Sequence, residues 1–299
     1  MRRVAFQGER GAYSEEAVLR RFGGEAEVLP CRTLRDVFRA TEDGTATEGL
    51  VPIENSLAGS INESYDLLLQ RSLTITGETV LRVRHCLLAR PGQTLADLSR
   101  VYSHPQALAQ CRDFLERHDL EAVAAYDTAG SAQFVSEKGP LRTGAIAGRR
   151  AAELYGLDIL AEGIESDPGN YTRFYVVACP DAVQLETPSA PHDSALTPGP
   201  APGGSADKTV LVFATSHLPG SLYRCLGAFA RRGIDLLKLE SRPIQGRPWE
   251  YLFYADLRGH ASADPVREAL RELEGQAAWV RVLGSFEAAE SAPSPVTLR

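Results

Sequence analysis

Residues 49–69 read GLVPIENSLAGSINESYDLLL, and the change of pattern within this stretch decides the fold class. Its first five residues, Gly49 to Ile53, form a short apolar run that predicts a strand. Beyond the polar residues that follow, apolar side chains recur on one face of a predicted helix, at Ile61, Tyr65, Leu68 and Leu69. A strand, a polar loop and an amphipathic helix in this order are typical of α/β folds.

The same alternation continues on both sides of this stretch. Apolar runs predict further strands at 2–6, 100–103, 122–126, 145–147, 158–161 and 173–178. Helical patterns cover about 14–22 and the residues after Pro105, which suits the first position of a helix. We therefore expect an α/β domain over residues 1–179, with parallel sheet covered by helices.

Residues 208–290 follow a different order of elements. Strands are predicted at 209–214, 234–243, 249–257 and 279–283, with one helix after the first strand and another after the third. The resulting order, βαββαβ, is that of a ferredoxin-like domain. A single sheet of this kind leaves an edge open, so we expect it to pair with another copy of the chain.

The stretch between these two domains has a composition of its own. Residues 180–207 hold six of the chain's 18 prolines and no aromatic residue. Such a segment buries too little apolar surface to offset its ordering entropy, and we interpret it as a linker. Residues 291–299 are expected to be a flexible tail.

The composition is that of a globular protein, with 43% hydrophobic and 24% charged residues and a net charge of -7. A negative chain repels phosphate backbones, which disfavours nucleic acid as a partner. Neither a membrane span nor a secretory leader is evident, and the five cysteines are scattered without a C-x-x-C pair. Because phosphate-binding, dinucleotide-binding and nucleophile-elbow motifs are also missing, we expect a cytoplasmic protein that needs no cofactor and no metal.

Polar residues follow several predicted strands, at the sheet edge where α/β proteins bind ligands. Glu54, Asn55 and Ser56 either cap the next helix or bind an anion at its N-terminus, with Glu54 as the nearest carboxyl group. His104 is a helix cap or a pH-active group. Thr128 lies in a capped turn or at a second carboxylate-binding helix N-terminus.

The most informative stretch is GNYTRFYVVA, residues 169–178. Here Asn170, Thr172 and Arg173 enter a strand that should be buried. An arginine beside an apolar run needs an anionic partner, either an internal glutamate or a carboxylate of a ligand. The residues alone therefore predict an α/β cleft that binds a small anion, linked to a ferredoxin-like module.

Five ordered motifs resemble the prephenate dehydratase family: VPIENS at 51–56, N-x-x-Y-D-L-L at 62–68, HCLL at 85–88, SHPQAL at 103–108 and N-x-T-R-F at 170–174. GSLY at 220–223 and ESRPI at 240–244 resemble the two phenylalanine-binding segments of the regulatory ACT domain. The resemblance implies a two-lobed, periplasmic-binding-protein-like catalytic domain followed by an ACT domain. Because the catalytic pattern starts at Arg2, we expect a monofunctional enzyme without a chorismate mutase domain.

The resemblance also implies an activity, the conversion of prephenate to phenylpyruvate with loss of CO2 and water. It makes Thr172 the essential residue, with Arg173 pairing with a carboxylate or locking the loop, and we add Glu54 to the same network. Gain of an aromatic ring drives this reaction, so no cofactor is needed as an electron sink. The expected substrate-binding residues are Asn55, Ser56, Thr128, Asn170, Phe174, His104 and Gln106.

Feedback inhibition by L-phenylalanine is expected at an interface between two ACT domains, in a homodimer or homotetramer. The residues implied are Gly220, Ser221, Leu222, Glu240, Ser241, Arg242 and Pro243. Without the resemblance, Gly220 reads as a turn and Arg242 as a solvated strand end. Two other functions stay open: a non-catalytic sensor of a small anion or amino acid, and a dehydratase that acts on arogenate.

Overall fold

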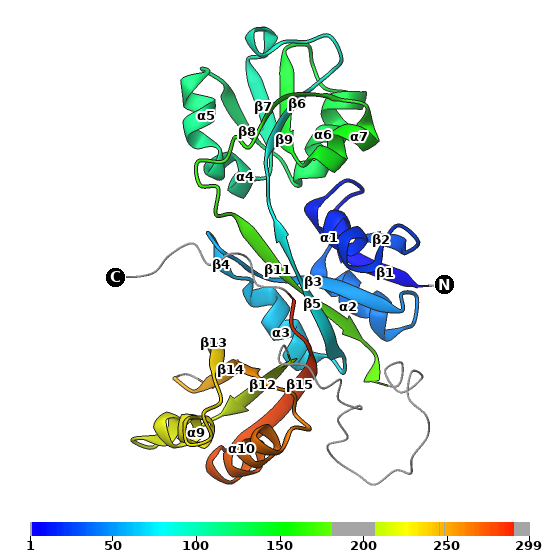
Figure 1. Cartoon of the computed structure of the whole chain (residues 1–299). Coiled ribbons are helices and arrows are strands. Elements are labelled where there is room, and N and C mark those ends of the chain that lie inside the picture. Colours follow the sequence, from blue (N-terminus) through cyan, green and yellow to red (C-terminus); the bar gives the residue numbers. More distant parts are fainter. Residues whose placement is uncertain (1, 181–206, 245, 248, 290–299) are drawn as a thin grey trace. The chain divides into compact units, whose positions relative to one another are not determined.

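The computed structural model describes residues 2–180, 207–244, 246–247 and 249–289 (Figure 1). By their contacts, Met1–Gln70 and Thr79–Phe174 belong to one compact unit, and Arg71–Glu78 and Tyr175–Glu290 to a second. The predicted linker lies outside the described residues except for Pro180 and Asp207, and so does the predicted tail. No helix in the described ranges combines the length and apolar composition needed to span a bilayer.

The first unit contains two lobes, each with its own sheet (Figure 1). In the first lobe the strand order is β2-β1-β3-β11-β5, with β4 paired to β3. The strands are β1 (Arg3–Gln7), β2 (Glu27–Cys31), β3 (Glu48–Asn55), β4 (Gly59–Ser60), β5 (Thr74–Arg82) and β11 (Tyr171–Ala178). The helices are α1 (Tyr13–Phe22), α2 (Leu34–Glu42), which begins with a capping box between Thr33 and Asp36, and α3 (Asn62–Gln70).

The second lobe has the strand order β10-β6-β9-β7-β8. Its strands are β6 (Cys86–Ala89), β7 (Arg100–Ser103), β8 (Glu121–Ala124), β9 (Thr143–Ala147) and β10 (Asp158–Glu162). Its helices are a short 3-10 turn at Leu95–Asp97 and α4 (Pro105–Gln110), α5 (Arg112–Arg117), α6 (Thr128–Glu137) and α7 (Arg149–Tyr155). Buried side chains such as Leu87, Val101 and Ile146 form its core.

The α/β class and the two lobes are confirmed, but the expectation of parallel sheet is wrong in part. β1 is parallel to β2 and β3, and β7 is parallel to β8 and β9. In contrast, β6 runs antiparallel to both β9 and β10. The chain enters the second lobe through β6 and leaves it through β10, so these neighbouring strands run in opposite directions.

The ferredoxin-like fold predicted for the C-terminal module is confirmed. Its elements are β12 (Asp207–Ala214), α9 (Ser221–Ala230), β13 (Leu236–Pro243), β14 (Tyr251–Arg258), α10 (Asp264–Gln276) and β15 (Trp279–Glu287). The sheet order is β13-β14-β12-β15, and each neighbouring pair is antiparallel. Phe213, Phe229 and Leu273 lie in the core between the sheet and the two helices, which leaves β13 as an edge strand.

A buried charge cluster lies within this second unit. The Lys208 Nζ atom lies 2.8 Å from both Glu78 Oε2 and Asp256 Oδ2, and the three side chains are at most 5% exposed. Tyr175 donates a hydrogen bond of 2.8 Å to Asp256. Glu78 belongs to β5 and Tyr175 to β11, so the cluster joins these two strands to the sheet of the ferredoxin-like module.

Candidate functional site

The end of β3 lies beside the start of β11, and three contacts define how they are paired. Ser56 N donates to Tyr171 O at 2.8 Å, and Asn55 Nδ2 donates to Thr172 Oγ1 at 3.1 Å. Arg173 Nη1 lies 3.4 Å from Glu54 Oε2. These contacts follow an antiparallel register, in which successive side chains point to opposite faces. Asn55 and Thr172 therefore share one face, and Glu54 and Arg173 share the other.

The Asn55 side chain is buried and has a fixed orientation. Its Oδ1 accepts hydrogen bonds from the backbone N–H groups of Leu57, at 3.1 Å, and Ala58, at 3.0 Å. Its Nδ2 must then face β11, where it donates to Asn170 Oδ1 at 2.8 Å as well as to Thr172. Because the Thr172 oxygen acts as the acceptor, the Thr172 hydroxyl proton is directed toward another group.

The same cluster continues into the second lobe through Asn170, which is fully buried. Asn170 Nδ2 donates to Gln110 Oε1 at 3.0 Å, and His85 Nε2 lies 2.8 Å from the same oxygen. Tyr13 Oη lies 2.9 Å from His85 Nδ1. Burial lowers the pKa of His85 and raises that of Tyr13, which favours a neutral imidazole that donates from Nε2 to Gln110. Tyr13 Oη also donates to Arg84 O at 3.1 Å, so its proton is shared between that carbonyl and His85 Nδ1.

In this network Gln110 Oε1 accepts two hydrogen bonds, one from Asn170 Nδ2 and one from His85 Nε2. Within the described residues, Gln110 Nε2 has no hydrogen-bond partner, so its two N–H groups remain as donors. Sequence reasoning missed Gln110, His85 and Tyr13. A usable signal was present, because Gln110 lies three residues after Ala107 and four before Phe114, both of them apolar.

The Ser56 side chain forms hydrogen bonds with the backbone of the segment that returns from the second lobe to the first. Its hydroxyl donates to Gly169 O at 2.5 Å and accepts from Tyr171 N at 2.8 Å. Ser56 therefore fixes the loop that precedes Asn170 and Thr172 instead of capping α3 as the sequence suggested.

The expected network between Glu54 and Thr172 is wrong. Glu54 pairs with Arg173, and both side chains are one-third exposed, on the face of the sheet opposite to Thr172. An internal glutamate is therefore one partner of Arg173 in the structure.

Four other expected site residues have local roles. Thr128 lies beside Asp127, whose carboxylate accepts from Ala129 N at 2.8 Å, so the N-terminus of α6 already holds an anion from this chain. His104 caps α4 by accepting from Gln106 N at 3.2 Å, and both side chains are exposed. Phe174 is 2% exposed and belongs to the core.

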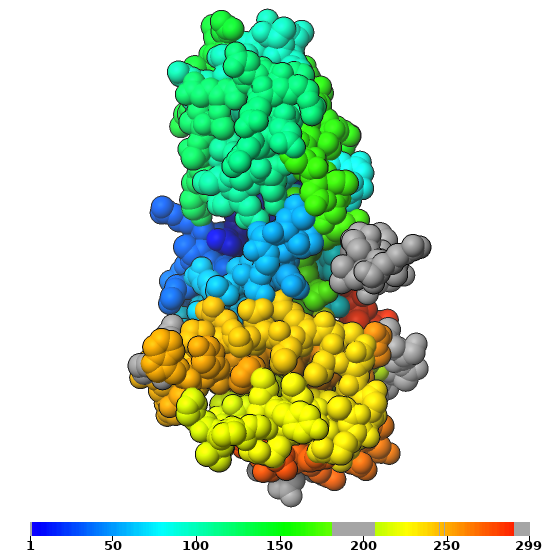
Figure 2. Space-filling model, turned by 90° about the vertical axis from the view of Figure 1, so that its left-hand side faces the viewer, coloured from blue at the N-terminus to red at the C-terminus, as the bar shows by residue number. Residues whose placement is uncertain are grey.

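The arrangement consists of neutral amide and hydroxyl side chains. Gln110 and Thr172 offer amide and hydroxyl protons, which can hold carboxylates and stabilise a departing oxygen, whereas the N–H groups of Asn55 are used by Asn170 and Thr172. Figure 2 shows a hollow between the second lobe, in green, and the first lobe, in blue. No group of three or more metal-binding side chains occurs among the residues that the structure describes.

The expected regulatory residues lie on two elements of the second unit. Gly220 has φ of 77° and leads into α9, where the buried Ser221 hydroxyl accepts from Arg224 Nη2 at 3.0 Å. Glu240 to Pro243 end the edge strand β13. In the described sheet β13 pairs with β14 on one side only. The segment from Glu240 to Pro243 therefore lies on an open edge, where a strand of a neighbouring molecule could pair.

Fold and site together define a two-lobed α/β domain with a cluster of neutral hydrogen-bonding side chains, followed by a ferredoxin-like module. A family model for prephenate dehydratase matches residues 4–182, and a model for the ACT domain matches residues 208–275. The chain belongs to the prephenate dehydratase family, and it is a lyase with a C-terminal ACT domain.

Individual relatives agree with this assignment. The chain is 41% identical over 293 residues to arogenate dehydratase/prephenate dehydratase 2, chloroplastic, of Arabidopsis thaliana, covering 95% of this chain and 72% of the relative. A prephenate dehydratase of Arthrobacter aurescens, solved in complex with L-Phe, has a TM-score of 0.82 and 31% identity, covering 99% and 93% of the two chains. The structure of GqqA, described as a novel type of quorum quenching acylase, has a TM-score of 0.83 and 37% identity, covering 98% and 99%.

Proposed function

We propose that this chain converts prephenate to phenylpyruvate at the cluster formed by Asn55, Gln110, Asn170 and Thr172. The observation that carries this proposal is the hydrogen bond from Asn55 Nδ2 to Thr172 Oγ1. It makes the Thr172 oxygen an acceptor, so the Thr172 proton is available for a substrate oxygen.

The proposed reaction breaks two bonds. The bond between the ring and its carboxylate breaks, and its electron pair enters the ring as CO2 leaves. The bond between C4 and its hydroxyl then breaks, and the departing oxygen takes up one proton from solvent and leaves as water. Thr172 stabilises the negative charge that develops on this oxygen by donating a hydrogen bond, and Asn55 strengthens that donor.

The other residues of the cluster hold the substrate or position those that do. Gln110 Nε2 offers two donors, which suit a carboxylate of the substrate. Asn170 is a positioning residue, because both ends of its amide are used by Asn55 and Gln110. Ser56 and the Glu54–Arg173 pair fix the two strand ends.

The face that carries Thr172 favours prephenate over arogenate. Arogenate has an ammonium group where prephenate has a keto oxygen, and an ammonium group needs an acceptor or a carboxylate. Thr172 and Gln110 present donors, and Glu54 lies on the opposite face of the sheet. A site lined with donors disfavours the ammonium group of arogenate, because the ammonium protons and the donors of the site would both lack acceptors.

The test is a direct comparison of prephenate and arogenate as substrates. We expect the purified protein to form phenylpyruvate from prephenate. Its kcat/KM should be higher for prephenate than for arogenate. A higher kcat/KM for arogenate would reject the argument from donors, and tight binding of prephenate without turnover would favour the non-catalytic sensor.

We propose in addition that L-phenylalanine inhibits the enzyme between two ACT domains of a homodimer or homotetramer. Gly220 suits the turn before α9, since its φ of 77° is left-handed and a Cβ at this position would lie only 3.3 Å from Arg224 Nη1. The edge strand β13 alternates in exposure, and Leu237 and Leu239 face outward. These apolar side chains on an open edge support pairing with a second copy. We also propose 1–179 and 208–290 as the bounds of the catalytic and regulatory domains.

Gly220→Val is expected to weaken inhibition by L-phenylalanine while basal activity stays intact. A branched side chain at a left-handed backbone position strains the turn and fills the space in front of α9. Initial rates across a phenylalanine titration measure this effect. Equal activity of the unmodified enzyme with and without phenylalanine would contradict the regulatory role.

A further inference from the structure

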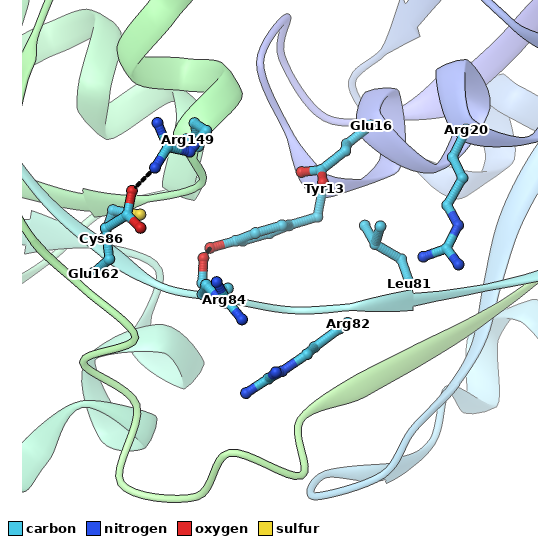
Figure 3. A pocket seen from close by; sticks show the side chains of 9 residues that line it. All are labelled: Tyr13, Glu16, Arg20, Leu81, Arg82, Arg84, Cys86, Arg149 and Glu162. Carbon is cyan, nitrogen blue, oxygen red and sulfur yellow. Dashed lines mark hydrogen bonds and ion pairs between the residues drawn. The ribbon is translucent and has the colours of Figure 1, made fainter. Parts of the chain in front are cut away.

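A second site in the first unit shares no lining residue with the cluster of Asn55, Gln110, Asn170 and Thr172. It is a cavity of about 310 Å³ lined by Tyr13, Glu16, Arg20, Leu81, Arg82, Arg84, Cys86, Arg149 and Glu162 (Figure 3). Its walls come from α1 of the first lobe, from the end of β5, the start of β6 and the chain between them, and from α7 and β10 of the second lobe. We call it the arginine pocket.

The arginine pocket holds more positive than negative charge. Arg149 forms an ion pair with Glu162. The Glu16 carboxyl group interacts electrostatically with Arg150 and Arg20. Across the described residues, the side chains of Arg82 and Arg84 form no ion pair, and the buried Arg82 Nε has no hydrogen-bond partner. Four guanidinium groups and two carboxylates leave two positive charges without a counter-charge, and a buried donor without a partner is costly.

The lining also includes apolar surface. The ring of Tyr13 crosses the middle of the arginine pocket, and Leu81 lies beside it (Figure 3). A ligand that fits both features has two or more negative charges on a short hydrocarbon body. Guanidinium groups bind carboxylates and phosphates equally well through paired N–H donors.

We propose that the arginine pocket binds a small organic polyanion, a carboxylate or a phosphate ester, at a site separate from the catalytic cluster. Its guanidinium groups come from both lobes, so one bound ligand contacts both and holds them in this arrangement. Tyr13 connects the two sites, because its ring lines the arginine pocket while its hydroxyl bonds to His85. Binding of a polyanion to the arginine pocket does not depend on the proposed function. An effect of that binding on prephenate turnover rests on the proposed function.

Calorimetric titration of the full chain tests this proposal, with citrate and glycerol 3-phosphate as probes at constant ionic strength. We expect at least one of them to bind, and Arg82→Gln/Arg84→Gln to weaken that binding by about tenfold or more, which is about 1.4 kcal/mol. The matched control is Arg112→Gln/Arg271→Gln, which removes two charges from exposed arginines outside the arginine pocket and should bind as the unmodified protein does.

The choice between the probes identifies the class of ligand. Binding of citrate alone assigns a polycarboxylate, and binding of glycerol 3-phosphate alone assigns a phosphate ester. Arg20→Gln, on a different element, should weaken binding in the same direction and covers the case in which the double variant does not fold. Absence of binding by both probes, or equal binding by the Arg82/Arg84 variant and the control, overturns the proposal whatever the activity on prephenate.

Discussion

Thr172→Val is expected to lower kcat by about 10²–10⁴-fold. Valine keeps the shape of threonine but removes the hydroxyl that accepts from Asn55 and donates to the departing oxygen. The effect should fall on kcat more than on KM, because the lost hydrogen bond strengthens as negative charge develops in the transition state. Steady-state assays with prephenate measure both constants.

Thr172→Ser is the matched control, since it retains the hydroxyl and loses only a methyl group. It should keep most of the activity. Unchanged thermal unfolding of the valine variant would show that the loss is chemical. Normal kcat in that variant would remove Thr172 from the mechanism and leave the cluster with a structural role only.

Lys208→Met is expected to lower the free energy of unfolding by about 3–5 kcal/mol, the usual cost of removing one partner from a buried ion pair. The substitution leaves Glu78 and Asp256 buried without their shared cation. Urea titration followed by tryptophan fluorescence is well suited to this test. Both tryptophans, Trp249 and Trp279, belong to the same unit as the cluster.

Two further variants separate charge from packing at this position. Lys138→Met changes an exposed lysine at the end of α6 and should shift stability by less than about 0.5 kcal/mol. Adding Glu78→Gln to Lys208→Met should recover part of the loss, because it removes one of the two stranded carboxylates. Equal stability of the Lys208 and Lys138 variants would show that the buried cluster does not hold β5 and β11 to the ferredoxin-like sheet.

Much of the fold could be predicted from local patterns. The helix at 62–70 and the strand at 100–103 follow from the spacing of apolar residues, and so does the order of elements in the C-terminal module. Strands β2, β5 and β6 were not predicted. The antiparallel placement of β6 was also missed, because pairing direction depends on how the chain crosses between lobes, which no local pattern records.

The candidate site was predictable only in part. The segments around Asn55 and Thr172 do lie together, but the sequence placed Glu54 with them. Strand alternation would have separated Glu54 from Asn55 once the register was known. Gln110 was missed because its partner Asn170 is 60 positions away, and only packing of the second lobe against the returning chain joins them.

By itself, the sequence indicated many of the helices and strands, the order of elements in the C-terminal module and which stretches carry polar residues. These properties depend on neighbours within a few positions, where periodicity and capping act. The tertiary structure decided which polar residues share a face, which arginines find a carboxylate and which do not. Those outcomes depend on sheet register and on lobes meeting across long sequence separations, where a shift of one residue turns every side chain to the opposite face.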